Sequence, residues 1–326
     1  MKRHISIVFV LCSLFTFRLA AQQEQQYTQY MVNGFVLNPA MAGSEDFIDL
    51  KAGYRQQWTG QELSPRTVYV SGHSSLKKGH GTGTNRHRNS KKFWHGVGGY
   101  VYSDEAGPFT QTAFYASYAW HQPISDEFTL SFGTFFGAKE HRLDGSNWNA
   151  YHENDALLVD RTFTTLVPDA SFGAFLYSKQ YFVGLSSMQM LGGNVGFDGL
   201  QGGAQVSESR LRRHYFLTAG TKVPLTYDVT MMPSIAIKAV QPAPISVDVN
   251  LMAQYKDLFF GGLSWRAGDA FSAIAGVVLA KQYEISYSYD LTVSQLSPYN
   301  SGTHEIVIGY RLKHGRHVDC PDRWWR

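Results

Sequence analysis

The sequence predicts an all-β protein: a single antiparallel transmembrane β-barrel of about 14 strands, with an N-terminal segment packed at or in its lumen. Three observations predict this class. After Phe47, apolar and polar side chains alternate with a period of two over most of the chain. A short basic and apolar leader opens the chain. Aromatic residues (14%) and glycines (31) are abundant together, which suits many strands joined by tight turns.

The alternating segments have one mainly apolar and one mainly polar face. Leu50 and Tyr54 alternate with Lys51 and Arg55, and the same pattern recurs at 283–291. Fourteen strands are expected near 47–57, 66–75, 93–103, 109–120, 127–141, 168–178, 180–190, 211–222, 230–240, 244–256, 257–265, 270–280, 281–291 and 303–314.

Two all-β architectures compete: soluble sandwiches or a propeller, and one transmembrane barrel. Polar-in, apolar-out strands of about 10 residues with aromatic ends favour the barrel, and so does an even strand count. With both termini on the periplasmic side, the turns at 122–123, 178–180, 256–257 and 281–282 are inner and short. The stretches 142–167 and 191–210 are then long outer loops, which is the usual asymmetry.

The chain divides into four parts. Residues 1–21 read as a signal peptide, 22–46 as an N-terminal non-barrel segment, 47–314 as the outer-membrane barrel and 315–326 as a periplasmic tail. Removing the leader takes Lys2, Arg3 and Arg18 from the 29 basic residues and leaves as many as the 26 acidic ones. A near-neutral mature chain offers no argument for nucleic-acid binding. Cys12 leaves with the leader, so a disulfide framework is not expected.

The stretch from Gln26 to Ser44 is neither a strand nor a solvated linker. It is rich in Asn, Gly and Pro, yet dense in apolar residues that need a surface to pack against. A barrel of this width must hold water or be occupied. We therefore expect this stretch to plug the lumen from the periplasmic end, with Asn38-Pro39 turning toward the first strand. The expected plug residues are Tyr27, Tyr30, Phe35, Leu37, Asn38 and Pro39.

The sequence predicts no enzyme, no cofactor and no metal site. It has neither an HExxH motif nor a cysteine cluster, and no GxSxG elbow. Ser71 with His73, and Ser301 with His304, are the pairs to consider for an outer-membrane lipase, but cross-strand hydrogen bonding explains them better.

One inner connection departs from the pattern of short turns. Residues 77–92 are long and basic, so they form either a disordered tether or a contact site for an acidic periplasmic partner. The C-terminal tail either touches a periplasmic partner or caps the barrel wall. The candidate partner contacts are Lys77, Lys78, Arg86, Arg88, Cys320, Trp324 and Trp325.

Several stretches together resemble the PorP/SprF family. They are Gln29-Tyr30, the run from Asn38 to Ser44, Tyr54 to Trp58, Gly96 to Gly99 with Asp104 and Gly107-Pro108, Ser286 to Asp290 with Ser294, and Ser301 to Ile306. Cys320-Pro321 resembles the family's C-terminal tail. The match runs from about Gln26 to Leu312.

The resemblance implies a non-catalytic outer-membrane protein of the type IX secretion system of Bacteroidota, in a family with some members tied to gliding motility. It also implies partners: a secreted surface adhesin with a type B C-terminal sorting domain, and the periplasmic ring or motor subunits. Family resemblance supplies no catalytic residues. A passive porin is the first alternative function and an outer-membrane lipase is the second.

Overall fold

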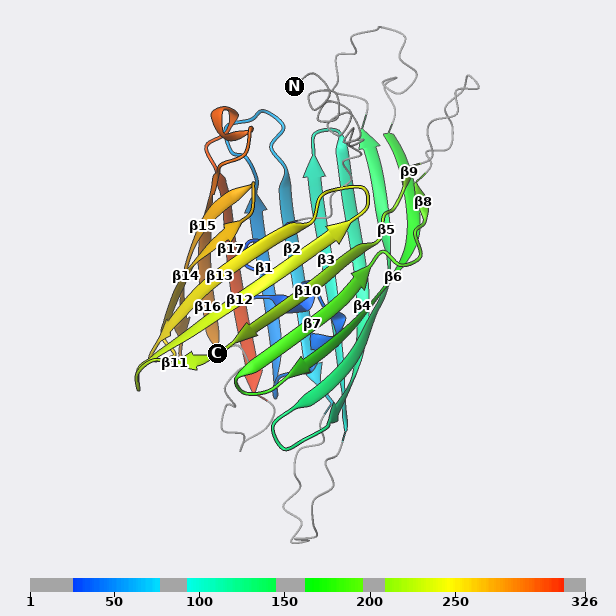
Figure 1. Ribbon diagram of the computed structural model, residues 1–326. Coiled ribbons are helices and arrows are strands. Elements are labelled where there is room, and N and C mark those ends of the chain that lie inside the picture. Colours follow the sequence, from blue (N-terminus) through cyan, green and yellow to red (C-terminus); the bar gives the residue numbers. More distant parts are fainter. Residues whose placement is uncertain (1–25, 77–92, 145–161, 196–208, 314–326) are drawn as a thin grey trace, which may run out of the picture.

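The computed structural model describes residues 26–76, 93–144, 162–195 and 209–313, and within them fourteen long antiparallel strands form one closed barrel (Figure 1). The strands are β1 (Phe47–Gln56), β2 (Arg66–Ser75), β3 (Trp94–Ala106), β4 (Phe109–Pro123), β5 (Thr129–Asp144), β6 (Thr162–Tyr177), β7 (Tyr181–Met188), β10 (His214–Thr221), β12 (Val229–Val240), β13 (Ser246–Tyr255), β14 (Phe259–Arg266), β15 (Ala270–Leu279), β16 (Tyr283–Thr292) and β17 (Thr303–Lys313).

Every strand pairs with its neighbours in chain order, and the first strand closes the ring by pairing with the last. Phe47 on β1 lies opposite Lys313 on β17, and Gln56 lies opposite His304. β10 pairs with both β7 and β12, so the ladder continues around the whole wall. Closure satisfies the backbone groups that an open sheet edge would present to lipid. The expected class, a barrel of about 14 strands, is confirmed.

The structure corrects some boundaries. β6 begins at Thr162, not near 168, and β5 extends to Asp144, so the connection between them is shorter than the expected 142–167 loop. Pro168 therefore lies inside β6 and does not start it. Before Phe172, β6 pairs with β5 alone. A proline, which has no N–H to donate, is tolerated where a strand has a neighbour on only one side. The expected 191–210 loop contains a short ribbon of β8 (Asn194–Val195) and β9 (Ser209–Arg210), and β11 (Val223–Pro224) continues the line of β10.

The two faces of the wall separate as the alternation predicted. On β1, Asp49, Lys51 and Arg55 are buried in the interior, while Leu50 and Tyr54 are exposed on the outside. Successive side chains of a strand point to opposite faces, so this pattern gives a polar interior and an apolar band toward lipid. Among the described residues no helix is long and apolar enough to cross a bilayer.

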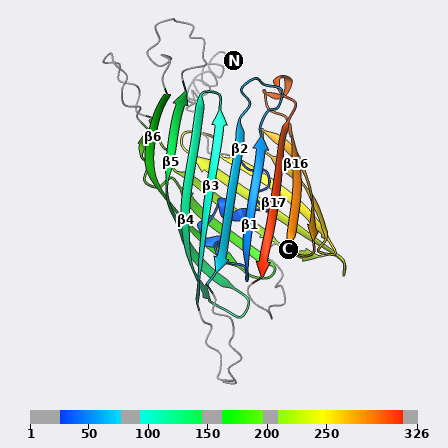
Figure 2. The same cartoon turned by 180° about the vertical axis from the view of Figure 1, so that it is seen from behind.

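The N-terminal segment, here residues 26–46, lies between the walls of the barrel. Its blue ribbon is behind β7, β10 and β12 in Figure 1 and behind β1 to β4 in the reverse view of Figure 2, so it is enclosed. It contains two single-turn 3-10 helices, η1 (Gly34–Val36) and η2 (Pro39–Met41); a third, η3 (Ser297–Tyr299), precedes β17. The segment then enters β1 directly.

Candidate functional site: the occupied lumen

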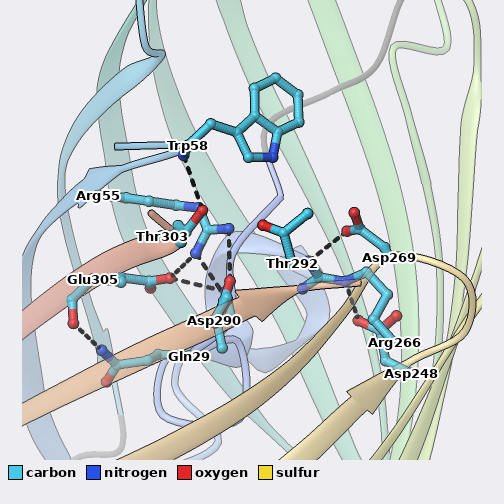
Figure 3. Close-up of polar contacts among 12 residues, drawn as sticks. Gln29, Arg55, Trp58, Asp248, Arg266, Asp269, Asp290, Thr292, Thr303 and Glu305 are labelled. Atoms are coloured by element: carbon cyan, nitrogen blue, oxygen red, sulfur yellow. Dashed lines mark hydrogen bonds and ion pairs between the residues drawn. The ribbon is translucent and has the colours of Figure 1, made fainter. Parts of the chain in front are cut away.

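A buried ionic cluster joins the first strand to the last two. Arg55 Nη2 lies 3.0 Å from Asp290 Oδ2, and Arg55 Nη1 lies 2.9 Å from Glu305 Oε2 (Figure 3). The Arg55 side chain is only 2% exposed and Glu305 is fully buried. Charges this deep persist only when paired, so the cluster requires all three residues together.

The N-terminal segment completes this cluster. The Thr28 backbone N–H donates to Glu305 Oε2 at 2.9 Å, and its hydroxyl donates to Asp290 Oδ2 at 2.5 Å. Arg55 Nη1 also donates to the Thr28 hydroxyl at 2.8 Å. Gln29 Nε2 donates to the Glu305 carbonyl, and Ser286 Oγ donates to Gln29 Oε1. Charge-assisted hydrogen bonds of this kind are the strong ones, so the start of the segment is held to β1, β16 and β17.

A second ionic cluster lies beside the first. Arg266 bonds to Asp248 at 3.4 Å and to Asp269 at 3.1 Å (Figure 3), and Lys238 Nζ lies 2.7 Å from Asp248. Tyr30 of the segment reaches this region, where Asn250 Nδ2 donates to its hydroxyl. Burial, followed by the nearby Asp248 carboxylate, raises the pKa of the Tyr30 phenol, so the phenol stays neutral as an acceptor.

Aromatic rings fill the middle of the lumen. The Tyr27 hydroxyl bonds to the Tyr100 hydroxyl at 2.6 Å, and the Tyr27 ring meets Tyr69 edge-on at 5.1 Å. Phe35 packs edge-on against Phe135 at 5.2 Å and is 1% exposed. Edge-to-face pairs add to simple burial. The segment therefore contributes apolar residues to a core that the barrel strands alone would leave incomplete.

A row of small residues crosses six strands, β2 to β7, where the end of the segment lies. From one strand to the next, the register pairs Ser75 with Gly96, Gly96 with Ala119, Ala119 with Gly133, Gly133 with Gly173, and Gly173 with Ser186. We call this set the small-residue row. A Cβ added at Gly133 would come under 3.0 Å from the Pro39 and Ala40 backbone, and one at Gly173 would meet Asn38. The glycines thus allow the segment's backbone to approach the wall closely.

Hydrogen bonds fix the segment along this row. Ser186 Oγ donates to the Leu37 carbonyl at 2.5 Å, and Ser131 Oγ donates to the Ala40 carbonyl at 2.7 Å. Two further carbonyls are engaged nearby: Ala42 O lies 2.7 Å from His121 Nε2, and Gly43 O accepts from Trp94 Nε1 at 2.9 Å. A segment without strand pairing thus has its backbone acceptors satisfied by inward side chains of β3, β4, β5 and β7.

The comparisons with known proteins match this architecture. The family model for Type IX secretion system membrane protein PorP/SprF matches residues 19–310. The chain belongs to the PorP/SprF family. A comparison with curated proteins gave no match. With the barrel fold, membership of this family places the protein in the outer membrane as part of the type IX secretion system.

Solved structures of two bacterial toluene transporters are similar to this PorP/SprF protein. The Ralstonia pickettii toluene transporter TbuX is 9% identical, with a TM-score of 0.51 over 89% of this chain and 94% of that chain. The Pseudomonas putida toluene transporter TodX is 8% identical, with a TM-score of 0.48 over 90% of this chain and 95% of that chain. At 9% identity the similarity to TbuX concerns the fold alone.

The residues expected to form a plug in this PorP/SprF protein all lie buried inside the barrel. Tyr27, Tyr30, Phe35 and Leu37 are at most 7% exposed, and Asn38 is 4% exposed. Asn38 Oδ1 accepts from the Ala40 N–H at 3.0 Å and caps η2, whose first residue is Pro39. Asn38 Nδ2 donates to the Ala174 carbonyl at 3.0 Å. The expected partner contacts Lys77, Lys78, Arg86, Arg88, Cys320, Trp324 and Trp325 lie outside the described residues.

The residues considered for lipase chemistry make contacts within the chain. Ser71 is buried and its hydroxyl accepts from Asn33 Nδ2 at 2.9 Å, while the His73 ring packs on Phe35 at 4.9 Å between centroids. Both therefore contact the N-terminal segment. Ser301 lies in the connection before β17, where its carbonyl accepts from Tyr289. Among the described residues no group of three or more His, Cys, Asp or Glu side chains is placed to hold a metal ion.

Sequence reasoning missed the small-residue row. Glycine was interpreted as a turn former, although counting the period of two from Ser171 places Gly173 on the inward face, and counting from Ser131 does the same for Gly133. The alternation within β5 and β6 therefore indicates that these two glycines face the lumen. The alignment of the six positions depends on the register between strands, which no single segment encodes.

Asn38→Ala tests the turn at η2. Removing the side chain leaves the Ala40 N–H without its cap and the Ala174 carbonyl without its donor. We expect the free energy of unfolding to fall by about 1–3 kcal/mol. Urea unfolding in lipid vesicles measures it. Asn38→Ser is the matched control: it keeps an oxygen that can cap the Ala40 N–H, introduces no charge and should lose less, so an equal loss in both variants would contradict the capping role.

Gly133→Val tests the fit of the segment against the row. The added branched side chain overlaps the Pro39 and Ala40 backbone, so we expect the segment to leave the wall while the barrel stays folded. In a Cys320→Ser background, Ala40→Cys reports the position by maleimide labelling. Labelling should be roughly tenfold faster in Gly133→Val than without it. Gly99→Val is the control, because Gly99 meets no atom nearer than 3.5 Å and faces outward; equal labelling in both would count against the fit.

Proposed function

We propose that this protein is a closed outer-membrane barrel that anchors a secreted adhesin, or its type B C-terminal sorting domain, and links it to periplasmic components of the type IX machinery. The mechanism is binding, without catalysis. Membership of the PorP/SprF family supports the secretion system as the setting. The adhesin and the periplasmic subunits are the partners that this proposal adds.

The observation that carries the proposal is the occupied lumen. The N-terminal segment bonds to Ser71 on β2, Ser131 on β5, Ser186 on β7, Asn250 on β13 and Glu305 on β17. These contacts are distributed around the barrel, so the segment crosses the lumen and does not merely line one side. A barrel filled in this way is suited to bear load and present a surface. It is poorly suited to let solutes diffuse through it.

The two ends of the barrel have different tasks in this proposal. The end that carries the connections 57–65 and 293–302 faces the cell surface and the adhesin. The opposite end, where β1 starts and β17 ends, faces the periplasm. The basic stretch 77–92 and the tail 315–326 supply the contacts to the ring or motor subunits, with Lys77, Lys78, Arg86 and Arg88 meeting acidic surfaces.

Affinity purification from native membranes tests this function. We expect a large surface adhesin and periplasmic ring subunits to copurify with the intact chain. Replacing Lys77, Lys78, Arg86 and Arg88 with Glu should remove the periplasmic subunits and keep the adhesin. Lys256→Glu with Lys281→Glu, placed in short turns at the same end, is the control for acidic substitution there, and it should keep both the periplasmic subunits and the adhesin. Recovery of the barrel alone from the intact chain would overturn the anchoring function.

Two other functions predict different results. A passive porin predicts a large steady conductance in a planar bilayer. An outer-membrane lipase predicts ester hydrolysis that Ser71→Ala or Ser301→Ala abolishes; on the anchoring account neither substitution changes hydrolysis. The contact of Ser71 with Asn33 of the segment favours a structural role.

A further inference from the structure

The first half of β6 rises beyond the strand that follows it. Figure 1 shows β5 and β6 extending past the ends of β7 and β10. β6 pairs with β5 over its whole length, from Thr162 to Tyr177, but with β7 only from Phe172 onward. One further hydrogen bond on the β7 side runs from the Met190 N–H to the Ala170 carbonyl at 2.9 Å. Within the part of the chain that the structure describes, the sheet therefore has an open edge along β6 before Ala170.

Alternation decides which backbone groups of β6 this edge presents. Along a strand, the N–H and C=O groups of successive residues point to opposite neighbours. Ala170 directs its carbonyl toward the β7 side, so Pro168, Leu166 and Thr164 direct theirs to the same side. Leu166 and Thr164 also present N–H groups there, and no described residue accepts a hydrogen bond from either. We call these three residues the β6 edge.

The β6 edge lies outside the apolar band of the barrel. Leu166 is opposite Glu140 on β5, and Thr164 is opposite Arg142. Both charged side chains point outward and are exposed. Closer to the middle of the wall, the outward residue of β5 is Phe136, which is 62% exposed. Charged residues are unfavourable on the lipid face, so this part of β5 and β6 stands in water. It does so at the end that the proposed function assigns to the cell surface.

A sheet edge with available donors and acceptors is a template for another strand. Proteins usually protect such an edge with lysines, inward charges or a covering segment. Here the outward side chains of Thr162, Thr164 and Leu166 carry no charge and are exposed, and threonine favours a strand. Two copies of the chain in one membrane both run β6 toward the periplasm, so their edges cannot pair antiparallel. The β6 edge is therefore suited to a different polypeptide.

We propose that the β6 edge binds one extended strand of the secreted adhesin or its sorting domain. The strand adds to the sheet antiparallel to β6, in the place that β7 leaves. This inference rests on the proposed anchoring function and names the surface that performs it. Hydrogen bonds between main chains supply the binding, and the neighbouring side chains select among sequences. Glu140 and Arg142 of β5 favour opposite charges on the incoming strand.

Proline substitution tests the main-chain contacts. Thr164→Pro with Leu166→Pro removes both N–H groups of the β6 edge and leaves the pairing with β5, which uses the other side of the strand. Pro168 lies on the same side of β6, so the strand already accommodates one such ring. Losing two hydrogen bonds should lower recovery of the adhesin from native membranes by about tenfold or more. Thr164→Ala with Leu166→Ala is the matched control: it keeps both N–H groups and should stay within about twofold of the intact chain.

Residue-resolved hydrogen exchange measures the same contacts without substitutions. The intact chain is compared in two states: produced without other type IX proteins, and purified as the complex with the adhesin. The N–H groups of Thr164 and Leu166 should exchange roughly tenfold or more slowly in the complex than in the chain alone. The N–H of Val167 points toward β5 and should be slow in both states. This measurement keeps the proposal testable if the proline variant does not fold.

The outcomes separate this proposal from the function on which it rests. If the intact chain recovers the adhesin and the proline variant recovers as much, the anchoring function stands and the β6 edge is not the contact. Equal exchange of the two N–H groups in both states leads to the same conclusion. Slow exchange already in the chain alone would show that another part of the same chain covers the edge, which also overturns the proposal. An intact chain that recovers no adhesin overturns the anchoring function itself.

Discussion

A variant lacking residues 27–44 is expected to fold as a barrel that admits small sugars, whereas the intact chain excludes them. An eight-stranded barrel is filled by its own side chains, but one of fourteen strands is wider and needs another occupant. Here the occupant is the N-terminal segment. Liposome swelling in sugar solutions measures the change, and we expect the rate to rise roughly tenfold or more above that of the intact chain.

Gly133→Val provides a second route to the same state. It displaces the segment without shortening the chain, so its swelling rate should approach that of the deletion, while Gly99→Val should match the intact chain. Heat-dependent gel mobility confirms that each variant is a folded barrel. If the deletion variant folds and still excludes sugars, the segment is not what closes the lumen.

Arg55→Met is expected to be the most destabilising single substitution in the lumen. It leaves Asp290 and Glu305 buried without their cation, since both ion pairs depend on the same guanidinium. Removing one partner of a buried ion pair costs about 3–5 kcal/mol, and we expect a loss of unfolding free energy in that range. Urea unfolding in lipid vesicles measures it.

Two further variants test whether the unpaired buried carboxylates cause this loss of unfolding free energy. Arg142→Met removes a pair with Asp144 in which both side chains are well exposed, and it should cost at most about 1 kcal/mol. Combining Arg55→Met with Asp290→Asn and Glu305→Gln removes the unpaired charges and should recover part of the loss. Equal losses for Arg55→Met and Arg142→Met would contradict a buried cluster.

The strands were predictable because their signal is local. The period of two in β1, which alternates Lys51 and Arg55 with Leu50 and Tyr54, is complete within ten residues. The start of β6 was missed because Pro168 resembles a strand start when the sequence is considered alone. Only the pairing shows that β7 does not yet accompany β6 there. The inward position of charged residues followed from the same alternation.

The partners of those charges were not predictable. Arg55 is 235 residues from Asp290 and 250 from Glu305, so their meeting depends on closure of β1 onto β17 and on its register. The apolar character of the N-terminal segment indicated that it needed a packing surface. Its route along Gly96, Gly133 and Gly173 required the alignment of strands β3, β5 and β6, which is a property of the assembled barrel.

The single-channel conductance of the intact, unmodified chain in a planar bilayer tests the central claim most directly, because that claim is a lumen closed by the chain's own N-terminal segment. The account predicts no steady open state for the intact chain, and stable openings when residues 27–44 are removed. A large, steady conductance from the intact folded barrel would contradict it and would favour a passive channel.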